Sequence, residues 1–190
     1  MTIPATRRLF LVTCLAALSA CGGSPKAKSP GWDLPRYEGE LVDLFDDNID
    51  PAAVGLSLEA QSPAADPRLR PRAQKADVVA RIRVQTVTRD SVGAKTSYIL
   101  GVQVGTPTLM PTKVLDQSYD LVIDKHESAF GLVQSLEQQL RGMTFIGFIK
   151  RFAGDDGPKL HWHLTADTEE VAQVIGEIAV LEEVAGQQAP

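Results

Sequence analysis

Two histidines separated by a single residue, His161 and His163, are the best candidates for chemistry in this sequence. Alternate residues of a β-strand point to the same face, so the two imidazoles could bind zinc or copper together. A metal site needs a third ligand, which His126, Asp124 or Asp167 could supply if the fold brings one of them near. Otherwise the two histidines lie on the solvated face of a strand.

Two arginines with the same spacing, Arg81 and Arg83, form a second candidate site for ligand binding. On the outward face of a strand they could hold carboxylates or glycans, or they could be ordinary solvated residues. The sequence has no Gly-x-Ser-x-Gly motif and no phosphate-binding loop, so it does not indicate an activated nucleophile. We therefore expect a protein that is not an enzyme and needs no cofactor.

The first twenty residues have the features of an export signal. Arg7 and Arg8 precede an apolar run over residues 9–18. This run is too short to cross a hydrocarbon core of about 30 Å. A positively charged start, a short apolar run and small residues before a break are typical of a secretory signal peptide. We therefore assign residues 1–20 to a signal peptide.

The end of this segment, Leu18-Ser19-Ala20-Cys21, resembles the lipobox of bacterial lipoproteins. The resemblance implies cleavage after Ala20, diacylation of the Cys21 thiol and acylation of the new amino terminus. Two or three acyl chains make a durable membrane anchor, whereas a single chain binds only marginally. The alternative is an ordinary cleaved signal followed by a coincidental cysteine.

Residues 21–34 join this cysteine to a Gly-, Ser-, Pro- and Lys-rich segment that is typical of a flexible tether. Gly22 occupies the position where an aspartate favours retention in the inner membrane in lipoproteins of this kind. The resemblance therefore implies a lipid-anchored protein of the cell envelope. It favours the outer membrane, facing the periplasm, over the inner membrane.

Charge and cysteine content narrow the choice of partners. Cleavage after Ala20 would leave 17 basic residues against 24 acidic ones, a net charge of −7. An acidic protein outside the cytoplasm is a poor candidate for binding nucleic acid. Cys14 would be lost with the signal and Cys21 would carry lipid, so no disulfide would stabilise the mature chain.

Hydrophobic patterns predict the elements that would position the candidate residues. For residues 35–75 we expect a helix over 37–48 and a Pro- and Arg-rich connector over 61–72, both packed on a main domain over 76–185. Alternating apolar residues, or in one case a continuous apolar run, predict five strands in that domain, and helical spacing predicts two helices. The expected strands cover residues 78–89, 98–104, 119–123, 143–152 and 160–164, and the expected helices cover 129–140 and a closing segment that ends at Gly186.

This order of elements resembles the OB-fold over residues 76–166. The resemblance implies a mainly β domain with helices, of the α+β class: a five-stranded antiparallel barrel with a helix between strands 3 and 4 and a C-terminal helix. Gly101 and Gly147 lie inside predicted strands, where a small barrel needs bends. The alternative is an open antiparallel sheet with helices on one face, which would produce the same pattern.

Three functions fit these features. The first is a membrane-anchored envelope lipoprotein that acts as a non-catalytic binding or assembly module for an envelope protein, a glycan or a small solute. The second is the small solute-binding lipoprotein of an ABC importer, because the stretches WDLP (32–35), DDNID (46–50) and ADVV (76–79) are similar to small uncharacterised lipoproteins, some with a cobalamin-transport label. The third is a metal-dependent enzyme using His161 and His163. About 150 ordered residues do not readily form two lobes around a large ligand, which favours the first function.

Overall fold

The computed structural model describes residues 33–56, 62–93, 95–112 and 116–187. The predicted signal peptide, its cleavage site at Ala20, the lipidation site at Cys21 and most of the tether lie outside the described residues. Among the described residues, no helix is both long and apolar enough to cross a membrane.

The described chain forms six strands, four α-helices and two short 3-10 helices. The first 3-10 helix covers Pro51–Val54 and the second covers Pro63–Ala65. In chain order the other elements are α1 (Glu40–Leu44), β1 (Asn48–Ile49), α2 (Leu69–Lys75), β2 (Val78–Val92), β3 (Lys95–Val104), β4 (Ser118–Asp124), α3 (Ala129–Leu140), β5 (Thr144–Gly154), β6 (Gly157–Ala166) and α4 (Glu169–Gln187).

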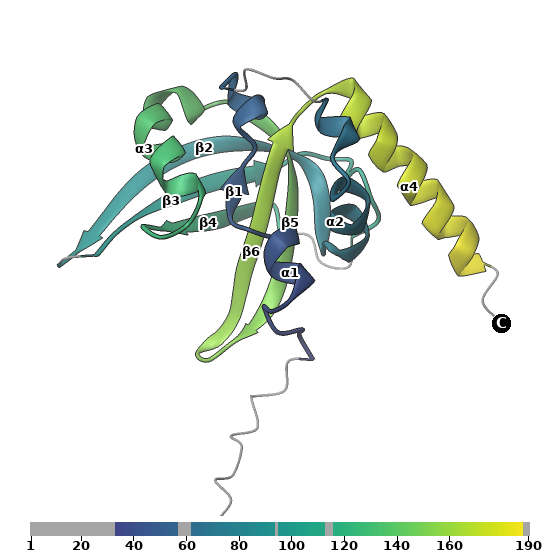
Figure 1. The fold of residues 1–190 in the computed structure, drawn as a ribbon, viewed down its shortest axis with the longest axis horizontal. Helices are drawn as coiled ribbons and strands as arrows, with labels where there is room; N and C mark the ends of the chain where they lie inside the picture. Colours follow the sequence, from purple (N-terminus) through teal and green to yellow (C-terminus); the bar gives the residue numbers. More distant parts are fainter. Residues whose placement is uncertain (1–32, 57–61, 94, 113–115, 188–190) are drawn as a thin grey trace, which may run out of the picture.

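The six strands form one sheet in the order β1-β6-β5-β2-β3-β4. All neighbouring strands are antiparallel except β1 and β6, which are parallel. The sheet curls into a half-barrel whose two edge strands are β1 and β4 (Figure 1). Among the described residues β4 therefore has a neighbouring strand on one side only.

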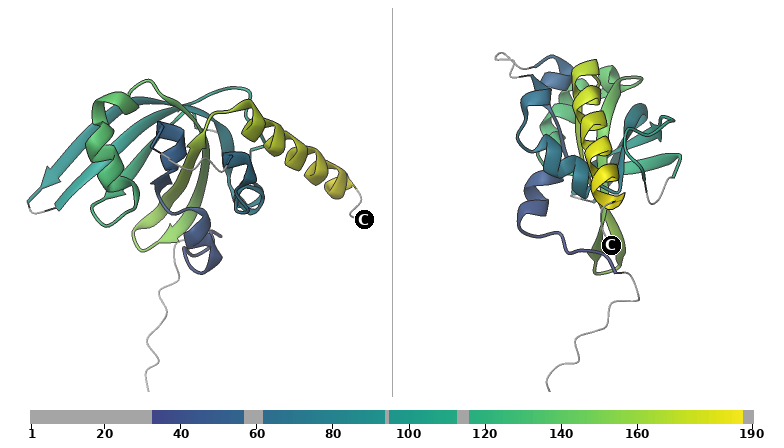
Figure 2. Two further views of the ribbon diagram at one scale, coloured as in Figure 1. Left: turned by 45° about the horizontal axis from the view of Figure 1, so that its top comes forward. Right: turned by 90° about the vertical axis from the view of Figure 1, so that its right-hand side faces the viewer.

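The long β2–β3 hairpin confirms the strongest strand prediction. The strands continue beyond the predicted ends through residues 90–92 and 95–97, which are mostly polar, and the hairpin extends away from the rest of the sheet (Figures 1 and 2). The register shifts between Val84 and Thr86, and Gly101 lies opposite Thr86 at this irregularity. The glycine thus marks the bend as expected, although the extra residue, Gln85, belongs to β2.

Helices cover both faces of the sheet. One face packs alternate residues of β2, such as Ile82, together with Trp162 against α3. The other face packs Val79 and Phe148 against α1, α2 and α4. Figure 2 shows α3 at one end of the molecule and α2 and α4 at the other. The two faces therefore support two separate hydrophobic clusters.

Residues 35–75 are tied to the sheet through a buried arginine. The Arg72 side chain is 2% exposed and its guanidinium lies 5.7 Å from the centre of the Phe148 ring. Its Nε donates to the Leu44 carbonyl at 2.8 Å, and one terminal nitrogen donates to Asp66 at 3.0 Å. These partners satisfy a charge that would be costly to bury alone.

The prediction of a closed five-stranded barrel is wrong. The five predicted strands are present as β2 to β6, but β1 is a sixth, and β6 does not pair with β4. Residues 47–50 occupy the β6 edge instead: backbone nitrogens of Asp47 and Asp50 donate to the carbonyls of Trp162 and Leu164, at 2.9 and 2.8 Å. The barrel stays open because this edge is already taken.

The alternative prediction, an open sheet with helices on one face, is correct in the openness of the sheet and wrong about the helices, which cover both faces.

The short elements of residues 35–75 also differ from the prediction. The expected helix over 37–48 is limited to α1 and is followed by β1, and the connector over 61–72 contains the start of α2. A two-residue strand and a seven-residue helix are too short to show a clear hydrophobic period.

The two-cluster arrangement predicts that core truncation on either face destabilises the whole domain. Leu140 on α3 and Ile175 on α4 are both fully buried, whereas Val180 on α4 is 60% exposed. We expect L140A and I175A each to lower the free energy of unfolding by about 2–5 kcal/mol, and V180A to change it by less than about 0.5 kcal/mol. Urea denaturation measures all three. A loss of stability in V180A equal to that in I175A would contradict the assigned face of α4.

Candidate functional site

A groove of about 810 Å³ opens where the half-barrel fails to close, and we call it the seam groove. It lies between the β4 edge with the following turn, the β5–β6 hairpin and the segment before β1. Its lining residues are Tyr37, Asp47, Asp120, Val122, Asp124, His126, Glu127, Ala153, Gly154, Asp155, Pro158, Lys159, Leu160 and His161. Its volume is typical of a ligand pocket.

His161 is held in the seam groove by three neighbours. Its Nδ1 lies 2.5 Å from Asp47 Oδ2. The Tyr37 ring stacks on the imidazole with a centroid distance of 3.5 Å and an interplanar angle of 5°, and Phe152 meets it edge-on. These contacts fix the position of the ring and assign one ring nitrogen to the aspartate.

Asp47 takes the place of a strand residue beside β6. It has a left-handed backbone conformation with a φ of 48°, which aspartate tolerates better than most residues. Its N–H donates to the Trp162 carbonyl, and its Oδ1 accepts the Trp162 N–H at 3.1 Å. Burial raises the pKa of the Asp47 carboxyl, although the hydrogen bonds from His161 and Trp162 act in the opposite direction.

His163 forms the corresponding pair with the preceding acid. Its Nδ1 lies 2.8 Å from Asp46 Oδ1. The two histidines therefore point to the same face of β6, as the alternation predicts, and each contacts a different aspartate. This arrangement commits one nitrogen of each imidazole to the fold.

The described residues contain one group of three side chains whose ligand atoms lie close enough for a metal ion, and it excludes His161 and His163. The group is Asp124, His126 and Glu127, with its ligand atoms within 4.8 Å of one another. Asp124 and His126 share the seam groove with His161, whereas Asp167 accepts a hydrogen bond from Arg81 at 2.8 Å.

Glu127 caps the end of the β4 edge. Its Oε2 accepts the Asp124 N–H at 2.7 Å. The pKa of Glu127 is raised to about 7, chiefly by burial and also by the negative charges of Asp47 and Asp124, while the hydrogen bond from Asp124 N–H acts in the opposite direction. This carboxyl therefore changes charge near neutral pH.

Tyr37 is a structural donor. Its hydroxyl donates to the Phe45 carbonyl at 2.6 Å. Burial, together with the charges of Asp47 and Asp46, raises the pKa of the phenol, so it stays protonated. Tyr37, Asp47 and Glu127 all line one groove and all have raised pKa values, a combination that marks candidate functional sites.

The two arginines predicted to bind a ligand lie on β2, away from the residues that line the seam groove. Arg81 forms ion pairs with Asp167 at 2.8 Å and with Glu169 at 3.6 Å. Arg83 is exposed two residues further along the strand. The structure thus places Arg81 in contact with the residues that precede and start α4.

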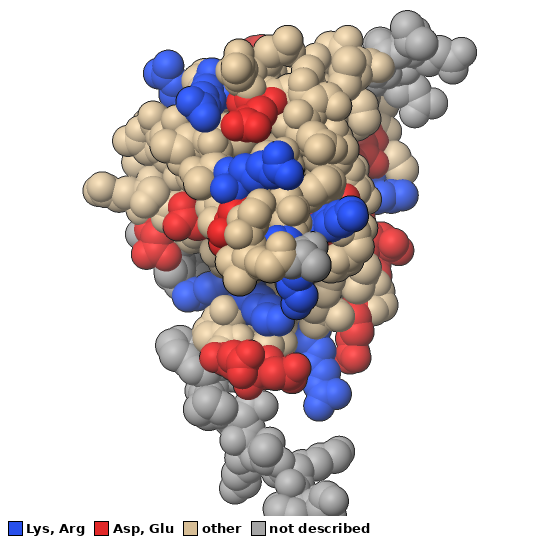
Figure 3. All heavy atoms as spheres, turned by 90° about the vertical axis from the view of Figure 1, so that its left-hand side faces the viewer, with Lys and Arg blue, Asp and Glu red and all other residues tan. Residues whose placement is uncertain are grey.

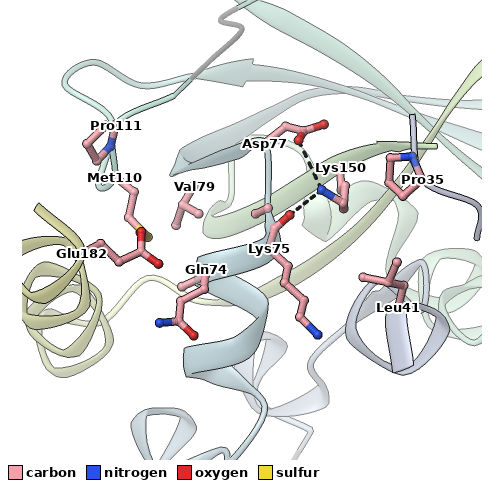
Figure 4. Close-up of a pocket in the computed structure, with 12 residues that line it drawn as sticks. Pro35, Leu41, Gln74, Lys75, Asp77, Val79, Met110, Pro111, Lys150 and Glu182 are labelled. Atoms are coloured by element: carbon pink, nitrogen blue, oxygen red, sulfur yellow. Dashed lines mark hydrogen bonds and ion pairs between the residues drawn. The ribbon is translucent and has the colours of Figure 1, made fainter. Parts of the chain in front are cut away.

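A second cavity of about 400 Å³ lies between α2, α4 and the loop after β3. Figure 4 shows the Lys150 ammonium between the Asp77 carboxylate and the Lys75 carbonyl, at 3.3 and 2.6 Å. Glu182 and Met110 line the opposite side of this cavity. Because Lys150 is tied to two structural partners, it is not free to bind an anion.

Basic and acidic side chains alternate over the surface toward which the β2–β3 hairpin points. Figure 3 shows Lys and Arg interspersed with Asp and Glu on this face, without a large area of one sign. A mixed surface of this kind keeps a protein soluble and favours no single class of charged polymer.

Comparisons of the chain with protein-family models, curated proteins and solved structures found no match. The function must therefore be inferred from the geometry of the site.

Sequence reasoning found His161, and it named His126 and Asp124 as candidates for a third ligand beside the two histidines. It missed Tyr37 and Glu127 as parts of the same groove. No local pattern marks either one, because their neighbours in the groove are distant in the sequence. The adjacent acids Asp46 and Asp47 were visible, but only the structure shows that each contacts one histidine.

The pKa of Glu127 predicts a pH-dependent contribution to stability. The folded state binds this proton more tightly than an ordinary glutamate with a pKa of 4.5, so the free energy of unfolding falls as pH rises from about 4.5 through about 7. E127Q keeps an acceptor for the Asp124 N–H and removes the charge. We expect it to match the wild type near pH 4.5 and to be more stable by about 1–2 kcal/mol near pH 8, after partial screening by solvent.

Urea denaturation at the two pH values measures this difference. E177Q, which changes an exposed glutamate of α4, is the matched control and should follow the wild type at both pH values. If the free energies of unfolding of E127Q and the wild type differed by the same amount at both pH values, the role assigned to Glu127 would be contradicted.

Proposed function

We propose that this protein is a membrane-anchored lipoprotein of the cell envelope that acts as a non-catalytic binding or assembly module through the seam groove. The anchor is the lipid on Cys21, which follows from the resemblance to a lipobox. The groove is the part of the domain that remains open to a partner.

The observation that carries this proposal is the state of the titratable groups in the groove. Asp47, His161 and Glu127 are each engaged in a hydrogen bond that completes the fold. A general acid or base must be able to reach a substrate proton, and groups fixed in this way suit recognition better than proton transfer. The raised pKa values are explained by burial at the seam.

Size and architecture favour a module over a solute receptor. The described residues form one sheet with two hydrophobic clusters, and the seam groove lies on that single body. A receptor that closes on a large solute needs two lobes with a hinge between them. A fixed groove at a strand edge is better suited to part of another envelope molecule.

Site-specific photo-crosslinking in living cells tests this proposal. A photoreactive residue replaces Val122, which is half-exposed in the groove, in the full-length chain. The matched control carries the same residue at Val180 on α4. We expect a discrete adduct with an envelope component from position 122 only, recovered with membranes.

A C21S version of the same chain provides the test of anchoring. It should lose lipid labelling and membrane recovery, and the adduct should decrease with them. Identical adducts from positions 122 and 180, or the absence of any adduct at 122, would contradict binding through the groove. Membrane recovery of C21S equal to that of the wild type would contradict the lipid anchor.

A further inference from the structure

One edge of β4 faces the seam groove, where the described residues provide no neighbouring strand. Val104 N donates to the Gln117 carbonyl, so in the antiparallel β3–β4 ladder the odd-numbered residues of β4 direct their backbone groups toward β3. Ser118, Asp120 and Val122 consequently direct theirs toward the open edge. Among the described residues, no strand occupies that edge.

Across the groove from β4, strand β6 also directs backbone groups away from its neighbour β5. Trp162 and Leu164 turn their backbone groups away from β5, toward Asp47 and Asp50. By the same alternation Leu160 also points away from β5, and it lines the seam groove beside Asp120 and Val122. The groove is therefore bordered by two strand edges.

Carboxylates limit the length of this open stretch. Asp47 accepts the Trp162 N–H on β6, and Glu127 accepts the Asp124 N–H at the end of β4. Between the start of β4 and the Glu127 cap, the edge from Ser118 to Val122 spans about 17 Å at about 3.4 Å per residue. This length matches a short extended segment.

Charge indicates the chemistry of such a segment. Three exposed acidic residues, Asp120, Asp124 and Asp155, line the groove beside a single lysine, Lys159. The other two acidic residues of the lining, Asp47 and Glu127, already hold hydrogen bonds of the fold. Asp120 and Asp124 flank Val122 on the outward face of β4, so basic side chains on an added strand would meet a carboxylate on either side of an apolar contact. Acidic side chains on an edge also discourage pairing with another acidic strand.

We infer that the seam groove accepts an extended, basic peptide segment of a partner protein, which adds as a strand to β4. Backbone hydrogen bonds to Asp120 and Val122 provide affinity, and the acidic lining selects lysine- or arginine-rich sequences. This inference rests on the proposed function and specifies the ligand of the same groove. Glycans and small solutes are the alternatives that the experiment separates.

The test measures binding of a labelled synthetic peptide of alternating lysine and valine to the purified full-length chain by fluorescence anisotropy. Two further peptides serve as controls: one replaces lysine with glutamate, and one is N-methylated at alternate backbone nitrogens. We expect the lysine peptide to bind, and both controls to bind at least tenfold more weakly.

Two substitutions at one position test the backbone contact. V122P removes the N–H that points to the open edge. An edge strand tolerates proline at such a position, so the hydrogen bonds to β3 remain. V122T keeps the N–H and serves as the matched control. Because the two variants differ at the backbone N–H, we expect V122P to bind the lysine peptide at least tenfold more weakly than V122T does.

Equal binding of the lysine peptide and its N-methylated form would overturn strand addition, and this comparison does not depend on any variant folding. Failure of the lysine peptide to bind would overturn it as well. An adduct from position 122 in cells, together with no peptide binding, would leave the binding module in place and assign it a glycan or solute instead. The absence of both would contradict the proposed function itself.

Discussion

The half-barrel depends on one buried aspartate, Asp47, which pairs with both backbone groups of Trp162 where β6 has no full strand beside it. A buried backbone N–H left without a partner costs about 1–3 kcal/mol, so a strand edge inside the protein needs such an acceptor. The same solution recurs at two other edges, where Asp77 accepts the Arg151 N–H and Glu127 accepts the Asp124 N–H. Carboxylates thus end strand pairing at three places in this sheet.

These caps explain both the shape of the sheet and the properties of its groove. Because Asp47 and β1 occupy the β6 edge, β6 cannot join β4, and the barrel remains open along the seam. Burial raises the pKa values of Asp47 and Glu127, and the negative charge of Asp47 adds to the rise at Glu127. The raised values therefore follow from how the fold ends its strands, and they need no catalytic explanation. Between the caps, β4 has no neighbouring strand on its groove side among the described residues.

Much of this fold could be predicted from the sequence, because β2 to β6 and α3 have regular hydrophobic periods. Trp162 was expected in the core, and it is fully buried there. The opening of the barrel could not be predicted, since it depends on a two-residue strand and on the left-handed backbone of Asp47. The seam groove could not be predicted from the sequence for a similar reason. Tyr37, Glu127 and His161 come from three separate segments, and only tertiary packing brings them together.

Amide hydrogen exchange along β4 of the full-length chain is the most direct test of the open seam. The N–H of Leu121 points toward β3, whereas the N–H groups of Asp120 and Val122 point toward the groove. An open seam predicts slow exchange at Leu121 and fast exchange at Asp120 and Val122, within a single strand. Equally slow exchange at all three amides would show that the β4 edge is already paired, as in a closed barrel, and would contradict the half-barrel and the binding role inferred from it.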